Sequence, residues 1–388
     1  MSCRDGKPTA AVSSMRKEQE IMPAILTRRG LLRATGAALV TAPFASACGG
    51  SERLAARCAT RRMAPPPLDD AGAEILRYAS LAASSHNTQP WRVHVREPRR
   101  WMLAADLSRR LPAIDPDDRE LKLSLGAFLE NLVLAAGALG WEATVEPRSE
   151  WPEVAEISLV PSAPSCVPLS RIAMRRTLRR GYAPTELAPG TVRTLLEAAN
   201  PAAFFGRRAP EGILLARAAL RSFRAQAQRD DAQRELSRWI RFSPSDIERA
   251  CDGLTPATME IGGLAGWYVR HFMKPEDVLS HSFREKGIEA AKVQVAEGGG
   301  FFVIVSRSNA TSDLLDAGRR FERMMLLLRE NGLAGQPMSQ ALEEPPWRSE
   351  IAGQLRLGGA PQFLVRVGHV SPYPAPVSPR RPVGDFCA

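Results

Sequence analysis

The sequence has few cysteine and histidine residues, and none of them is spaced like a ligand pair. No CxxC pair occurs among the six cysteines, which are Cys3, Cys48, Cys58, Cys166, Cys251 and Cys387. The five histidines never occur as HxxxH or beside a cysteine at ligand spacing. We therefore expect neither a disulfide framework nor a metal site.

Clusters of positive charge are also missing. Of the 52 basic residues 46 are arginine, and they are scattered along the chain without a run of five or more. Nucleic-acid binding is therefore not expected, although the formal net charge is +10. The length of 388 residues, with 44% hydrophobic and 24% charged residues, is typical of a folded chain with two or three domain-sized units.

The first part of the chain has the pattern of a targeting signal. Arg28 and Arg29 precede an apolar run at 34–44, which leads into Ala45-Ser46-Ala47-Cys48. The run is too short to cross a bilayer, which takes about 20 residues. It resembles a twin-arginine (Tat) export signal. We expect the Tat machinery to deliver the protein to the periplasm or cell surface, with 1–47 as signal and 48–67 as linker.

Two outcomes of processing remain open at the end of this signal. Ala45-Ser46-Ala47-Cys48 resembles a lipobox, in which Cys48 would become the lipidated first residue of the exported protein. Ordinary cleavage after Ala47 fits the same residues equally well.

The first folded unit is expected at 68–165. Asp69 or Asp70 would cap a helix that carries Ile75, Leu76 and Ala79 at helical spacing. A polar loop follows at 84–91. Alternation and apolar runs then predict strands at 93–95, 101–105, 143–145 and 154–160, and a buried helix at 121–139.

The second unit, 166–388, starts within a Pro/Ser break at 161–168. Its pattern predicts helices at 171–180, 191–199 and 314–329, and strands at 212–215, 301–305 and 362–367, before a Pro-rich tail. Both units thus repeat the order helix, loop, strands, long helix and strand. This order suggests an ancient duplication, although no tight sequence repeat remains.

Three motifs resemble those of the FMN-binding nitroreductase superfamily. The stretch SSHNTQPW at 84–91 resembles its PSxxNxQPW loop, with Ala83 where the family usually has Pro. RRTLR at 175–179 resembles its RRSxR motif with Thr for Ser, and SPRRP at 378–382 resembles its basic C-terminal tail. In that family these elements bind FMN at the interface of a homodimer.

In this chain the loop occurs only in the first unit and the Arg motif only in the second. The resemblance therefore implies an α+β, nitroreductase-like fold of two fused pseudo-dimeric halves, each with a mostly antiparallel sheet flanked by helices. This arrangement is similar to the Acg subgroup. It implies one FMN site and a monomeric protein.

The residue types at these motifs suit FMN. Arginine binds phosphate in a bidentate manner, and Arg175 and Arg179 would share one face of a helix. Hydroxyls and amides can bind the ring and ribityl oxygens. The predicted cofactor-binding residues are Ser84, Ser85, His86, Asn87, Gln89, Arg175, Arg176, Thr177, Arg179, Gly335, Arg380 and Arg381. No catalytic side chain is predicted, because the flavin itself accepts and donates hydride.

The stretch 255–282 combines glycines with Trp267, Tyr268 and Phe272, and it is a candidate lid over the flavin. An ordinary amphipathic helix pair is the alternative interpretation. The leading hypothesis is an exported FMN-dependent oxidoreductase that passes hydride from NAD(P)H or another donor to an electron-poor small molecule. The alternatives are a non-catalytic protein that sequesters FMN beneath the lid, and a surface lipoprotein with a degenerate site.

Overall fold

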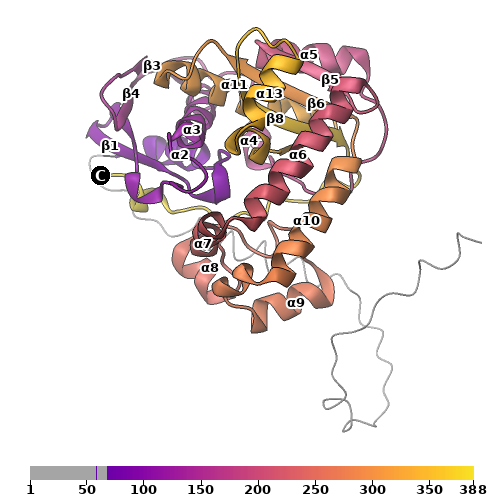
Figure 1. Ribbon diagram of the computed structural model, residues 1–388. Coiled ribbons are helices and arrows are strands. Elements are labelled where there is room, and N and C mark those ends of the chain that lie inside the picture. Colours follow the sequence, from indigo (N-terminus) through magenta and orange to yellow (C-terminus); the bar gives the residue numbers. More distant parts are fainter. Residues whose placement is uncertain (1–57, 59–67) are drawn as a thin grey trace, which may run out of the picture. The chain divides into compact units, whose positions relative to one another are not determined.

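Two four-stranded antiparallel sheets form the framework of the described chain, which comprises residue 58 and residues 68–388 of this computed structural model (Figure 1). The predicted α+β class, with antiparallel sheets flanked by helices, is confirmed. The export signal, Cys48 and all of the predicted linker except Cys58 lie outside the described residues.

The first sheet contains, in spatial order, β1 (Trp91–Glu97), β2 (Arg100–Ala105), β4 (Glu153–Pro161) and β3 (Trp141–Pro147). Along β3 half-buried and exposed residues alternate, as expected for an edge strand with one face in solvent. The helical segments of this half are α2 (Asp70–Ala79), η1 (Ser85–Asn87), η2 (Leu107–Arg109) and α3 (Arg119–Ala138). Asp69 caps α2, because its carboxylate accepts a hydrogen bond from the Gly72 amide at 2.8 Å.

The second sheet contains, in spatial order, β5 (Ala202–Gly206), β6 (Gly300–Ser306), β8 (Ala360–His369) and β7 (Leu333–Pro337). Every residue of β6 is buried, in keeping with its continuous apolar sequence and central position. The helices around this sheet are α4 (Leu169–Ala173), α5 (Pro189–Ala199), α6 (Pro210–Gln228), α11 (Thr311–Glu330), α12 (Gln340–Glu343) and α13 (Trp347–Gln354), and η4 (Val383–Asp385) lies in the tail.

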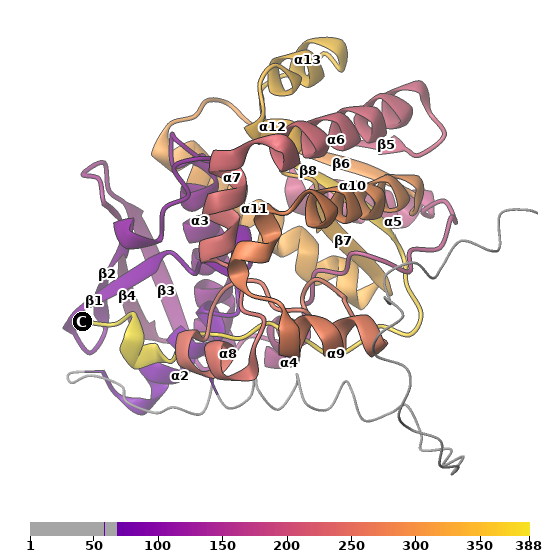
Figure 2. The ribbon, with the colours of Figure 1, turned by 60° about the horizontal axis from the view of Figure 1, so that its bottom comes forward.

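A group of helices is inserted between β5 and β6, after α6. It consists of α7 (Asp230–Arg238), α8 (Pro244–Ala250), α9 (Gly263–Phe272), η3 (Pro275–Leu279) and α10 (His281–Ala296). In both views α8 and α9 lie near each other at one edge of the described unit (Figures 1 and 2). The predicted lid, 255–282, corresponds to α9 and η3 with the turns before them.

The long helices α3 and α11 lie between the two sheets and pack on each other (Figure 2). Glycines allow the close approach: a Cβ on Gly126 would lie 2.1 Å from the Leu315 carbonyl oxygen, and one on Gly318 would lie 2.1 Å from that of Leu123. Among the described residues, α3 is the one helix with the length and hydropathy of a membrane span. However, 72% of its apolar window is buried inside the protein, as in the core helix of a folded domain.

Two predicted elements were wrong. The run 212–215 belongs to α6, because a four-residue apolar run cannot distinguish a strand from a buried helix segment. The helix predicted at 171–180 ends at Ala173, and the chain continues without regular structure. Contacts with distant segments hold this stretch, including the bond from the Ala183 amide to the His369 carbonyl at 2.8 Å.

The expectation of no disulfide framework was also wrong, since Cys58 and Cys251 form a disulfide across 193 residues. Spacing motifs reveal local cysteine pairs only, and they give no signal for partners this far apart. The bond attaches the segment before the folded unit to the end of α8.

Candidate functional site

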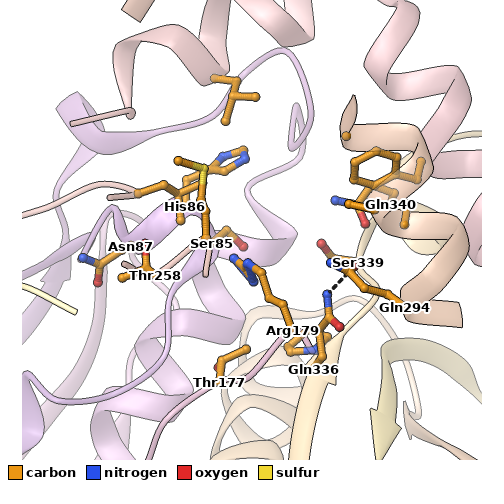
Figure 3. Close-up of a pocket in the computed structure, with 18 of the residues that line it drawn as sticks. Ser85, His86, Asn87, Thr177, Arg179, Thr258, Gln294, Gln336, Ser339 and Gln340 are labelled. Carbon is orange, nitrogen blue, oxygen red and sulfur yellow. Dashed lines mark hydrogen bonds between the residues drawn. The ribbon is translucent and has the colours of Figure 1, made fainter. Parts of the chain in front are cut away.

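A cavity of about 1190 Å³ lies among segments from both halves. One wall is the loop 84–87 and another is the stretch 175–180, and the two predicted motifs therefore border the same space. Further parts of the wall come from α3, α6, α7, α9, α10 and the residues after β7. Figure 3 shows Arg179 extending into this space toward Ser85 and His86, with Gln336, Ser339 and Gln340 on the opposite side.

Nine of the twelve predicted residues line the cavity: Ser84, Ser85, His86, Asn87, Arg175, Arg176, Thr177, Arg179 and Arg380. The structure places the other three elsewhere. Gly335 lies in β7, where a Cβ would come within 2.7 Å of the Met325 sulfur, so its role is close packing. Gln89 and Arg381 are buried and hydrogen-bonded to each other: the Arg381 amide donates to Gln89 Oε1 at 2.8 Å.

The amides of the loop 84–89 hold the loop in place. Asn87 Nδ2 donates to the carbonyls of Gly253 and Pro379, each at 3.1 Å, and its Oδ1 accepts from Arg380. Gln89 Nε2 donates to the Cys251 carbonyl at 2.9 Å. The motif amides therefore fix the strained loop backbone, in which His86, Asn87 and Gln89 all have positive φ.

Arg175 and Arg380 flank one buried carboxylate. Arg175 Nε lies 2.9 Å from Glu322 Oε1, and both side chains are almost fully buried. Burial raises the pKa of Glu322, although Arg175 and Arg380 favour its charged form. Burial, with a smaller contribution from Arg175, lowers the pKa of Arg380 to about 9. The charge of Arg175 is thus already paired within the protein.

Arg179 differs from these arginines, because no described residue forms a side-chain hydrogen bond or ion pair with its guanidinium. Burial and the nearby Arg176 lower the pKa of Arg179, whereas Glu260 raises it.

His86 faces the same space, and its Nδ1 has no hydrogen-bond partner. Burial and the nearby Arg179 lower the pKa of His86 to about 4, so the ring is neutral near pH 7.

Sequence patterns did not reveal the amide-rich wall opposite the motifs. It contains Gln226, Gln294, Gln336 and Gln340, and Gln336 Nε2 donates to Gln294 Oε1 at 2.9 Å. Glu343 lies beside them, and burial together with Glu120 raises its pKa to about 8. These residues come from separate helices and from the end of a strand that was not predicted, so no local spacing links them.

The described residues contain no group of metal-ligating side chains. Two α+β halves that share one cavity, with an arginine motif on one side and a polar loop on the other, are consistent with a cofactor-binding protein of the nitroreductase class.

Comparison with known proteins supports this class. The chain is 28% identical to the provisionally named NAD(P)H nitroreductase Rv3131 of Mycobacterium tuberculosis, over 79% of this chain and 88% of that protein. It is 27% identical to PigM of Serratia sp., also provisionally named an NAD(P)H nitroreductase, over 76% and 86% of the two chains. This similarity over most of the chain agrees with the resemblance of its motifs to the nitroreductase superfamily.

Two further comparisons add little. No protein-family model matches the chain. The FMN-dependent nitroreductase NfnB of Mycobacterium smegmatis, solved in complex with NADPH, aligns with 55% of this chain and 94% of its own at 14% identity. Its TM-score of 0.36 is too low to bear on the fold.

Proposed function

We propose that the protein is an FMN-dependent oxidoreductase of nitroreductase type, which reduces an electron-poor small molecule with electrons from NAD(P)H. The observation that carries this proposal is the meeting of loop 84–87 and stretch 175–180 at one cavity. The names of the relatives Rv3131 and PigM support the reaction class.

The residues around the cavity fit FMN. Its volume of about 1190 Å³ is somewhat larger than the range of about 300 to 1,000 Å³ that is usual for small-molecule sites, so the cavity has room for a cofactor of this size. Arg179 offers an unpaired, half-buried cation that extends into the cavity, where it could bind an anion such as a phosphate by charge-assisted hydrogen bonds. His86 Nδ1 offers a buried polar atom without a partner.

We assign different tasks to the residues of the motifs. Arg179, with the hydroxyl of Thr177 beside it, would bind the phosphate. Ser84 and His86 would contact the polar groups of the cofactor from the loop. Arg175 and Arg380 would act indirectly, because they hold the loop through Glu322 and Asn87. Bound FMN would supply hydride acceptance and donation.

The setting of this activity is part of the proposal. The twin-arginine pattern at 28–29 supports export of the folded protein with its cofactor, and Cys48 supports a lipid anchor. The disulfide between Cys58 and Cys251 is the kind of bond that forms in an oxidising compartment. Since both halves of the site are in one chain, we propose a monomer.

Sequestration of FMN is the second candidate, because α9 contributes Ala265, Tyr268 and Val269 to the cavity wall, and this supports a covering role. Anaerobic stopped-flow mixing of the FMN-loaded protein with NADPH separates the two. The reductase proposal predicts rapid bleaching of the flavin band, followed by reoxidation on adding a nitroaromatic compound or a quinone. A band that stays unbleached would favour sequestration and reject the reductase.

A further inference from the structure

Helix α9 exposes an apolar stripe to solvent. Of the ten large apolar side chains that are exposed among the described residues, four belong to this one helix, with exposed fractions of 84%, 50%, 56% and 59% for Leu264, Trp267, Tyr268 and Phe272. Their positions i, i+3, i+4 and i+8 place them on one side of the helix. The opposite side, with Gly266 and Val269, is buried.

This orientation reverses that of an ordinary surface helix, which buries its apolar side. The exposed rings contact each other: the centroids of Trp267 and Phe272 are 5.4 Å apart, and those of Tyr268 and Phe272 are 5.3 Å apart. Tryptophan and tyrosine suit the boundary between lipid and water, because an apolar body and a polar tip share one side chain.

The charges around the stripe are compatible with anionic headgroups. Residues 263–272 include no acidic residue, and the basic residues Arg270 and Lys274 lie within this helix and shortly after it in the sequence. Glu276 and Asp277 follow in η3, so we expect apolar insertion to contribute more to binding than charge does.

The disulfide brings the start of the folded unit to this same region. Cys58 is joined to Cys251, at the end of α8. Leu254, shortly after Cys251, packs in one apolar cluster with Val269 of α9. Cys48 precedes Cys58 by ten residues, which can span at most about 35 Å. A lipid attached to Cys48 would therefore enter the bilayer within a short reach of this region.

We infer that the exposed side of α9 docks on a phospholipid bilayer that carries anionic headgroups. The inference rests on the exposed stripe and on the attachment of Cys58, and it does not depend on the proposed flavin chemistry. Docking in this way would also bring one wall of the cavity to the membrane, because Tyr268, Val269 and Met273 line that cavity.

The test uses protein recovered after export in a Cys48→Ser background, so that no attached lipid contributes. Because Cys48→Ser would block lipobox-dependent cleavage, a protease site introduced after Ala47 is used to remove residues 1–47, and mass spectrometry verifies the product. Binding is measured by sedimentation with vesicles of equal parts phosphatidylglycerol and phosphatidylcholine, and by the shift of tryptophan fluorescence. A triple variant, Leu264→Ser with Trp267→Ser and Phe272→Ser, should bind these vesicles about 100-fold more weakly, since each change removes an inserted apolar group.

A matched control variant carries the same number of changes at exposed apolar residues on other elements, namely Leu107→Ser, Val160→Ser and Ile213→Ser. It should bind like the parent, and the circular dichroism spectra and Tm of both variants should match those of the parent. Absence of parent binding to the vesicles, or equal loss in the two triple variants, would overturn the inference. A dimer in analytical ultracentrifugation that only the α9 variant abolishes would also overturn it, because a second copy would then cover the stripe.

Discussion

Replacing His86 by Asn should make the stability of the protein less sensitive to acid. Asn is suited to this position, because residue 86 has φ 49° and ψ 18°, a left-handed conformation that Asn tolerates well. In the folded protein burial and Arg179 lower the pKa of His86 to about 4, against an ordinary value of 6.5. The unfolded chain therefore binds a proton below about pH 6.5, whereas the folded chain does so only near pH 4.

The sign and size follow from these two values. Stability that depends on neutral His86 is present above pH 6.5 and is lost as the pH falls toward 4. Between pH 7.5 and pH 5.0 the loss amounts to about 2 kcal/mol, at about 1.4 kcal/mol for each pH unit below 6.5. This is an upper limit, since the ring borders an open cavity.

The assay is urea unfolding of the flavin-free parent and the His86→Asn variant at both pH values, followed by circular dichroism. Other buried groups titrate in this range, among them Asp115, whose pKa burial raises to about 6. Their effects are common to both proteins, so the difference between parent and variant isolates His86. An identical pH dependence in the two proteins would refute the reasoning, because it would show that burial and Arg179 do not lower the pKa of His86.

Three further changes test the described contacts. Cys251→Ser should lower the unfolding free energy in urea by about 2 to 4 kcal/mol in oxidised protein and have little effect under dithiothreitol; equal effects in both conditions would argue against the disulfide. Gly126→Ala should cost about 3 kcal/mol or more in the same assay, whereas Gly190→Ala, in open space, should cost nothing; equal costs would exclude the close crossing of α3 and α11. Arg179→Ala should weaken FMN binding in fluorescence titrations by about 10- to 100-fold and leave riboflavin binding unchanged, while Arg175→Ala should instead lower stability by about 3 to 5 kcal/mol because it leaves a buried charge unpaired. Loss of FMN and riboflavin binding to the same extent in Arg179→Ala would place that side chain away from the phosphate.

Long, strongly patterned elements could be predicted from the sequence. The apolar runs gave β6, α3 and α11 nearly at their observed positions, because burial on most sides leaves a clear pattern. The loop at 84–91 was found through its motif. The path of 174–183 could not be predicted, because the ion pair of Arg175 with Glu322 and other long-range contacts determine it.

The candidate site, like the fold, could be predicted only in part from the sequence. The sequence indicated which motif residues would come together, but only the structure shows that Arg175 is paired within the protein whereas Arg179 faces the cavity. The disulfide and the amide-rich wall depend on residues far apart in the chain, so no spacing rule could reveal them.

We propose that the two halves together form a single FMN site, and the most direct test of this proposal is the flavin content of the purified protein. Cofactor released by acid is identified by chromatography and quantified against the protein concentration. One FMN per chain is predicted, because the loop 84–87 and Arg179 meet at one cavity. The proposed site would be contradicted if the folded protein neither retains FMN nor binds added FMN. It would also be contradicted if the protein holds two FMN per chain.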